Sequence, residues 1–221
     1  MDTLFGNTQA QADLSFPLTL AERYRPSTLD EFVGLPKAKQ LFKKFLAHPK
    51  ESSWLFVGAS GTGKTSMALA LAKLIPAELH HIPSQNCNLE TIERVRRTCQ
   101  YVPAAGFKAH LVLVDEADRM SEAAQVALLS KLDGTDKAPN TIWIFTCNAT
   151  DRFEPRFLSR HFRVEFSTYA IAKDTAAFLE KVWDAEAPEA ATKPNFTRLV
   201  KDANNNIREA LMSLEMELMV A

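Results

Sequence analysis

The chain has 221 residues, of which 46% are hydrophobic and 24% are charged, and its formal net charge is -1 at pH 7. This length suits one sizeable core, or one domain with a small satellite. The near-zero charge excludes a protein that coats nucleic acid by bulk charge. Any DNA contact must therefore come from a local basic patch, or from patches aligned across several subunits.

The three cysteines, Cys87, Cys99 and Cys147, are far apart and form no C-x-x-C pair. This spacing argues against a zinc site and against a disulfide framework, and it favours a reducing compartment. No apolar run reaches the length of a membrane span, and the start MDTLFGNTQAQ lacks the pattern of a signal peptide. We therefore expect a soluble, cytoplasmic protein.

Strand and helix patterns alternate along the chain, which is typical of an α/β protein whose parallel sheet is covered on both faces. Residues 1–16 are polar and turn-rich, and we expect a flexible tail there. We then expect, in chain order, a helix at 36–47, strand SSWLFVG, helix TSMALALAKLIP, strand ELHHIP, helix NLETIERVRRTCQYV, strand AHLVLVDEAD, helix SEAAQVALLSKLDG, strand TIWIFTCN and strand FRVEF. After about Tyr169 the strand pattern ends, and three helices are predicted. The sequence thus predicts a sheet domain over 17–168 and a helical domain over 169–221.

The stretch GASGTGKT, residues 58–65, fits G-x-x-x-x-G-K-[ST], with an apolar strand before it and a helix after it. Its glycines let the backbone curl so that N–H groups point inward toward a polyphosphate. Lys64 would then reach the β- and γ-phosphates, and the Thr65 hydroxyl would face Mg²⁺. The alternative is a glycine-rich turn with an exposed lysine. The expected nucleotide contacts come from the whole loop: Gly58, Ala59, Ser60, Gly61, Thr62, Gly63, Lys64, Thr65 and Ser66.

Asp115 and Glu116 end the apolar strand HLVLVDEAD. The carboxyl ends of parallel strands open onto the ligand crevice, so both acids should face the phosphates. Asp115 fits the acid beside Mg²⁺, and Glu116 is placed to orient or deprotonate an attacking water. The alternative is a pair of acids that cap a helix starting near Asp118.

Three further polar residues are candidates for the site. Asn148 ends TIWIFTCN, where its amide would reach the γ-phosphate or its water, although asparagine there is also a common turn residue. Arg160 in FLSRHF would stabilise transition-state charge on a neighbouring subunit's nucleotide, or form a surface salt bridge. Arg208 in NNNIREAL would fold back onto the phosphates, or lie on a solvated helix face.

These motifs, in this order, resemble the AAA+ ATPases, and among them the small subunits of sliding-clamp loaders (replication factor C and the bacterial tau/gamma subunit). The resemblance runs from about Leu20 to Leu218. DEADRMSEAAQVALL is similar to the clamp-loader Walker B strand and following helix, including Gln125, and LSRH resembles the Ser-Arg-Cys motif with His161 in place of the cysteine. ERYRPSTLDEFVG resembles the N-terminal box that wraps adenine, which implies base contacts from Tyr24, Arg25, Pro26, Val33 and Gly34.

The resemblance implies an AAA+ P-loop fold, with a five-stranded parallel sheet flanked by helices and a three-helix lid. It implies an ATPase that binds ATP and Mg²⁺ at the junctions with other AAA+ subunits. Asn148 would be its sensor 1, Arg208 its sensor 2 and Arg160 a finger acting in trans. Hydrolysis would be stimulated by primer–template DNA and a ring-shaped clamp.

In these relatives the helix matching IERVRR follows the DNA backbone. Arg96 is therefore the best match for a phosphate contact, with Arg94 and Arg97 as further matches. The alternative is a solvated helix face. In addition QADLSF, residues 11–16, resembles the short peptides that clamp-binding proteins insert into the clamp, the alternative being an apolar anchor for the tail.

The sequence also departs from clamp-loader subunits, which usually carry a third, C-terminal helical domain that forms a collar. This sequence ends after the lid, so we expect either an excised fragment or a short relative that assembles differently. Two rival functions remain: another AAA+ ATPase of DNA repair or recombination, and a nucleotide-gated scaffold that does not hydrolyse ATP. The intact set Lys64, Asp115, Glu116 and Asn148 weighs against the scaffold.

Overall fold

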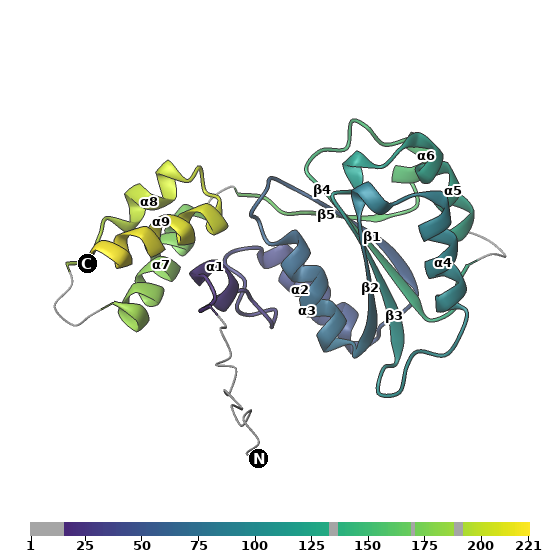
Figure 1. The fold of residues 1–221 in the computed structure, drawn as a ribbon, viewed down its shortest axis with the longest axis horizontal. Helices are drawn as coiled ribbons and strands as arrows, with labels where there is room; N and C mark the ends of the chain where they lie inside the picture. Colours follow the sequence, from purple (N-terminus) through teal and green to yellow (C-terminus); the bar gives the residue numbers. More distant parts are fainter. Residues whose placement is uncertain (1–15, 133–136, 169–170, 188–191) are drawn as a thin grey trace, which may run out of the picture.

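The fold combines a five-stranded sheet, covered by helices, with a group of three helices beside it (Figure 1). The computed structural model describes residues 16–132, 137–168, 171–187 and 192–221. Its strands are β1 (Ser52–Val57), β2 (Ala77–Pro83), β3 (Ala109–Asp115), β4 (Thr141–Cys147) and β5 (Phe162–Glu165). Its helices are α1 (Leu20–Arg23), α2 (Pro36–Ala47), α3 (Lys64–Leu74), α4 (Leu89–Cys99), α5 (Glu122–Leu132), α6 (Pro155–Leu158), α7 (Ala172–Glu186), α8 (Phe196–Asp202) and α9 (Ile207–Val220), with 3-10 turns η1 (Ser84–Asn86) and η2 (Ala117–Arg119).

The sheet has the strand order β2-β3-β4-β1-β5, and every neighbouring pair is parallel. This confirms the predicted five-stranded parallel sheet. The central strands β3 and β4 are buried on both faces, which explains why they read as continuous apolar runs rather than as alternating patterns.

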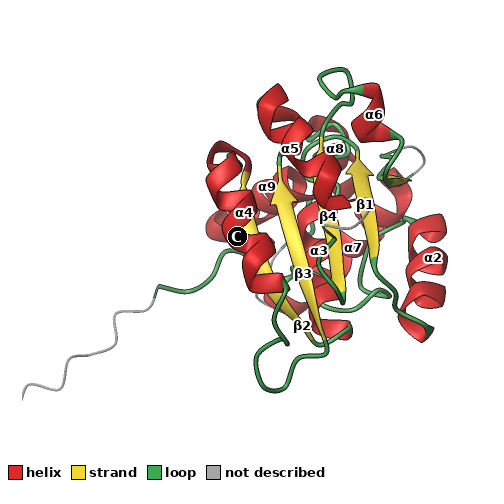
Figure 2. Cartoon of the chain, turned by 90° about the vertical axis from the view of Figure 1, so that its right-hand side faces the viewer, coloured by secondary structure: helices red, strands yellow, loops and turns green. Residues whose placement is uncertain are grey.

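Alternate residues of each strand pack on opposite faces of the sheet. Leu111 and Leu113 lie in a core with α2 and α3, whereas Val112 and Val114 lie in a core with α4, α5 and α6. Figure 2 shows α2 and α4 on opposite sides of the strands. Helices therefore cover both faces of the sheet, and the carboxyl ends of its strands are left for a ligand site.

The helices α7, α8 and α9, the predicted lid, share an apolar core. The core includes Leu20 of α1, which is 1% exposed and whose N–H lies 3.3 Å from Glu215 Oε1 on α9. A residue from near the start of the chain is therefore part of the packing of its last helices, beside which α1 lies in Figure 1. The division of the chain at residue 168 stays a prediction.

Part of the predicted clamp-binding peptide, and the predicted tail with it, lies outside the described residues. Of Gln11–Phe16 only Phe16 is described, and its side chain is exposed. In the part of the chain that the structure describes, no helix is both long enough and apolar enough to cross a membrane.

Candidate nucleotide site

A pocket lies where β1, β3 and β4 end, and four separate parts of the chain line it. The segment after α1 contributes Tyr24, Arg25, Pro26 and Val33, and the P-loop (Gly58–Thr65) with the next residue contributes Ser60 to Ser66. The strand ends contribute Asp115, Glu116, Thr146 and Asn148, and the lid contributes Arg208. Most of the predicted site residues thus meet in one pocket, although they come from distant parts of the sequence.

The P-loop has the backbone curl that the motif predicts. Gly61 and Gly63 have φ values of +74° and +90°, and α3 starts at Lys64 directly after Gly63. A Cβ on Gly61 would lie 1.8 Å from Asn206 Oδ1, at the cap of the lid helix α9, so a larger residue would have to displace the Asn206 side chain and also hold a left-handed backbone. The loop and the lid are therefore in direct contact, and the N-terminus of α3 faces the pocket, as phosphate binding requires.

Lys64 is held at the centre of the loop by three acceptors. Its Nζ donates to the carbonyl oxygens of Gly58 at 2.6 Å and Ala59 at 2.8 Å, and to Asn148 Oδ1 at 3.1 Å. Burial lowers the pKa of the ammonium, while Cys147, Asp115 and Asp118 act in the opposite direction. Gly58 and Ala59 do not line the pocket, and in this structure their carbonyls bind Lys64.

A chain of hydroxyl and carboxylate groups joins α3, β3 and β4. Asp115 Oδ1 accepts from Thr65 Oγ1 at 2.8 Å and from Thr146 Oγ1 at 2.5 Å. Thr146 Oγ1 in turn accepts from the Glu116 N–H at 3.0 Å. The hydroxyl of Thr65 and the carboxylate of Asp115 supply the hard oxygen ligands that Mg²⁺ prefers, so these residues fit a magnesium ion.

Sequence reasoning missed two residues that contact Asp115. Thr146 is a buried hydroxyl near the carboxyl end of a largely apolar strand, and a polar residue at that end of the strand was the available sign of a role. His81, near the end of β2, places Nε2 at 3.8 Å from Asp115 Oδ2. The neighbouring strands β2 and β4 therefore both reach the carboxylate at the end of β3.

Glu116 follows β3 in a left-handed conformation, with φ 53° and ψ 46°. This conformation turns the chain out of the strand and brings Glu116 to the wall of the pocket. Its carboxylate is 3.2 Å from Arg119 Nη1, and both side chains are exposed. The predicted water-activating acid is thus accessible from solvent.

The part of the pocket predicted to hold the base is bordered by aromatic and aliphatic side chains. Tyr24 lies edge-on to Phe178 of α7 with ring centroids 6.3 Å apart, and its hydroxyl donates to Glu186 at 2.8 Å. Burial and the Glu186 carboxylate raise the pKa of that hydroxyl. Gly34 does not line this pocket: a Cβ there would lie 2.7 Å from Ile171, which precedes α7.

Arg160 follows α6 and lies outside this chain's own pocket. Its Nη1 donates to the carbonyl oxygen of Arg156 at 2.5 Å. The loop before α6 is fixed by Gln125 of α5, whose buried amide donates to the Arg152 carbonyl and accepts from the Glu154 N–H, both at 3.0 Å. A position outside the pocket agrees with action on a neighbour's nucleotide, which stays a prediction.

Arg96 is engaged within the chain. Its Nε lies 3.0 Å from Glu93 Oε2, and Glu93 also pairs with Lys131 of α5 at 2.9 Å. Arg94 and Arg97 lie on the exposed surface of the same helix. The structure does not test the DNA contact predicted for Arg96.

Comparison with known proteins identifies the class. The model of the ATPase family associated with various cellular activities (AAA) matches residues 54–169, more than half of the chain. The chain therefore belongs to the AAA family of ATPases, as its motifs predicted.

Particular relatives narrow this class. The chain is 33% identical over 210 residues to replication factor C subunit 3 of Blastobotrys adeninivorans, covering 90% of this chain and 60% of that protein. It is 34% identical over 146 residues to replication factor C small subunit 1 of Pyrobaculum islandicum, covering 63% of this chain and 44% of that protein. The predicted resemblance to clamp-loader small subunits is thus confirmed, and the chain spans about half the length of these relatives.

Solved structures support the fold. The Thermotoga maritima RuvB Holliday junction branch migration motor superposes with a TM-score of 0.70 at 19% identity, over 87% of this chain and 64% of that one. At this identity the likeness shows a shared AAA+ fold.

Thr146→Val should weaken nucleotide-dependent activity as well as stability. The change removes the hydroxyl that bonds Asp115 and leaves the Glu116 N–H without its acceptor. We expect about 1–3 kcal/mol less free energy of unfolding and roughly tenfold weaker Mg²⁺-dependent ATP binding. Denaturant unfolding and nucleotide titration measure the two effects. Thr141→Val is the matched control, because Thr141 is buried at the other end of β4 and bonds Pro139. Equal loss of ATP affinity in both variants would contradict the role of Thr146.

Proposed function

We propose that this chain is the Mg²⁺-dependent ATP-hydrolysing subunit of a clamp-loader-like complex that acts in DNA replication. In this proposal, ATP binding at subunit junctions is coupled to the handling of a sliding clamp and primer–template DNA. The replication factor C relatives support this assignment, one of them over 90% of the chain. The complex would contain other AAA+ subunits, of the same or related chains, and would work in the cytoplasm.

The single observation that carries the catalytic part is the network that joins the P-loop to the ends of β3 and β4. Lys64 bonds Asn148, and Thr65 and Thr146 both bond Asp115. ATP with Mg²⁺ supplies the transferable phosphoryl group and its charge neutralisation. Around it, Lys64 would leave the carbonyls of Gly58 and Ala59 to bind phosphate oxygens, and Thr65 with Asp115 would hold the metal.

The remaining site residues would sense the γ-phosphate and complete the hydrolysis reaction. Asn148 and Arg208 both line the pocket, one just after β4 and one on α9. They are therefore placed to connect the γ-phosphate to the sheet and to the lid. Glu116 would accept a proton from the attacking water, while Arg160 would reach the nucleotide of the next subunit.

The basic face of α4 supports the DNA part of the proposal. Arg94 and Arg97 are exposed there, with Arg96 beside them in its ion pair with Glu93. A single chain with net charge -1 offers only this kind of local patch, so DNA binding would depend on several copies of α4 in one assembly.

The test is ATP turnover by the purified chain, alone, with primer–template DNA and with a four-way junction, together with its mass in solution with ATP. We expect turnover that rises with primer–template DNA and accompanies assembly. Full-rate turnover by a monomer would contradict the shared site. Stimulation by the junction and not by primer–template DNA would instead favour a repair or recombination ATPase. Binding of ATP without any turnover in the assembled state would favour a scaffold.

A further inference from the structure

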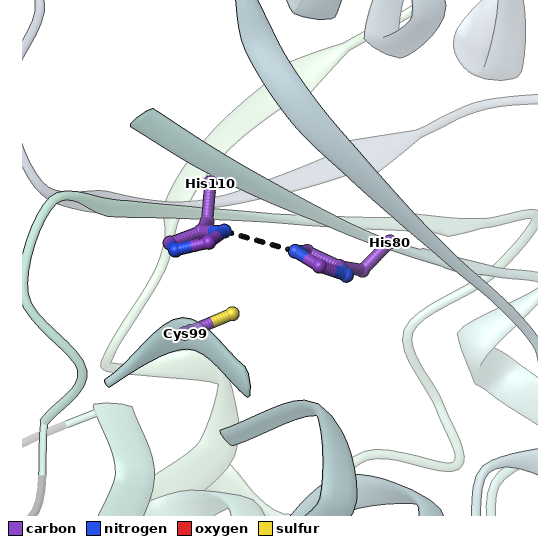
Figure 3. Close-up of side chains that lie close together, drawn as sticks. All are labelled: His80, Cys99 and His110. Carbon is purple, nitrogen blue, oxygen red and sulfur yellow. Dashed lines mark hydrogen bonds between the residues drawn. The ribbon is translucent and has the colours of Figure 1, made fainter. Parts of the chain in front are cut away.

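Two histidines and a cysteine lie close together (Figure 3). They are on the face of the sheet opposite α2 and α3, and none of them lines the nucleotide pocket. His80 comes from the edge strand β2, His110 from its neighbour β3, and Cys99 from the last turn of α4. One ring nitrogen of each histidine and the Cys99 Sγ all lie within 4.8 Å of one another. Cys99 and His110 are almost wholly buried, and His80 is half-buried. This is a compact set of nitrogen and sulfur donors in a sheltered position.

The backbone fixes which nitrogen His110 offers to this cluster. Its Nε2 lies 3.0 Å from the carbonyl oxygen of Tyr101, and a carbonyl oxygen only accepts hydrogen bonds. Nε2 must therefore carry the ring proton, so Nδ1 presents a lone pair toward His80 Nε2, which lies 3.0 Å away. An imidazole whose second nitrogen donates to a backbone carbonyl is the usual arrangement of a metal-ligating histidine.

A carboxylate and an open pocket lie beside His110. Glu78 Oε2 lies 3.6 Å from His110 Nδ1. Glu78, His110 and Tyr101 line an open pocket on this side of the sheet, so His110 forms part of the wall of a pocket that is open to solvent. A metal ion therefore has a route to His110 and a carboxylate close to the ring of that histidine.

We propose that His80, Cys99 and His110 bind a zinc ion, with the Glu78 carboxylate beside His110 as a candidate for the fourth position. One thiolate with two imidazoles is a donor set that suits tetrahedral Zn²⁺ and not Mg²⁺. The ion would tie the edge strand β2 and its neighbour β3 to the end of α4, the helix that carries Arg94, Arg96 and Arg97. This zinc would be structural and separate from the magnesium position at Asp115. The inference does not depend on the proposed function.

The deciding experiment is a titration of the purified full chain with CoCl₂, without nucleotide, followed by ZnCl₂. Cobalt replaces zinc in such sites and reports a bound thiolate by charge-transfer absorption in the near ultraviolet. We expect about one equivalent of cobalt with this absorption, its displacement by zinc, and a zinc-dependent rise in melting temperature. Absence of the thiolate absorption in the unaltered chain would overturn the proposal without the use of any variant.

Matched variants assign the absorption to the cluster. Cys99→Ser should abolish it, whereas Cys87→Ser should keep it, because Cys87 is a buried cysteine that contacts Met120 instead. His80 is the more exposed of the two histidines, and His80→Gln should weaken cobalt binding by more than roughly 10- to 100-fold. That range is the effect expected for a residue that only hydrogen-bonds to a metal ligand. Circular dichroism without metal establishes that each variant folds. Absorption that persists in Cys99→Ser, or binding unchanged in His80→Gln, would also overturn the proposal.

Discussion

Replacement of Glu116 by glutamine is expected to lower ATP turnover by at least about 100-fold while leaving ATP binding intact. The amide cannot accept the proton of the attacking water, but it keeps the size of the side chain and its place at the pocket wall. Binding should persist because the proposed polyphosphate contacts come from Lys64, Thr65 and the P-loop backbone. Single-turnover hydrolysis and nucleotide titration with the same preparation measure both quantities.

Glu122→Gln is the control for this substitution. Glu122 is an exposed glutamate in the first turn of α5 and does not line the pocket, so its replacement removes one charge without touching the site. Turnover that falls equally in both variants would indicate a general charge effect. Turnover indifferent to Glu116→Gln would show that Glu116 does not activate the water.

Replacement of Arg160 by alanine is expected to lower the assembly-dependent ATP turnover by about 10³- to 10⁵-fold. ATP binding by the single chain should not change, because Arg160 lies outside the pocket that its own chain forms. Arg160 bonds Arg156 within one local turn, so we expect the loss of turnover to arise at the neighbour's nucleotide rather than from the fold. Arg156→Ala, at an exposed arginine on the preceding helix α6, is the control and should keep turnover.

A mixing experiment makes the shared site visible. In an assembly of identical chains with head-to-tail junctions, equal amounts of Glu116→Gln and Arg160→Ala should recover about a quarter of normal turnover. Half of the sites then hold an intact glutamate, and half of the neighbours supply an intact arginine. A mixture no more active than either variant alone would contradict action in trans.

Much of the fold followed from the chain order of apolar runs and glycines. The continuous runs HLVLVD and TIWIFTC are buried on both faces, so their pattern pointed directly to a parallel sheet. The P-loop was equally plain, because Gly61 and Gly63 occupy backbone conformations that few other residues adopt. The pocket positions of Asp115, Glu116 and Asn148 followed from the rule that strand ends gather ligands.

What the sequence did not reveal depends on contacts between distant segments. Cysteine spacing argued against a zinc site, yet Cys99 lies beside two histidines from different strands, and no linear pattern joins the three. In the sequence Thr146 looks like any other strand threonine, because its bond to Asp115 forms only where β4 lies beside β3. Arg96 reads as a free basic residue until Glu93, one helical turn earlier, is seen to pair with it.

The packing of α1 against the last helices has a mechanical consequence. Besides Leu20 in the lid core, Arg23 pairs with Glu186 of α7 at 2.9 Å, and Tyr24 bonds the same carboxylate. Any rotation of the lid against the sheet must therefore carry Tyr24 along with Arg208. Tyr24, which is predicted to contact the base, and Arg208, which is predicted to contact the phosphates, would then move together as one rigid body. A spectroscopic probe attached near Leu20 would therefore report the orientation of the lid relative to the sheet, although Leu20 lies near the other end of the polypeptide.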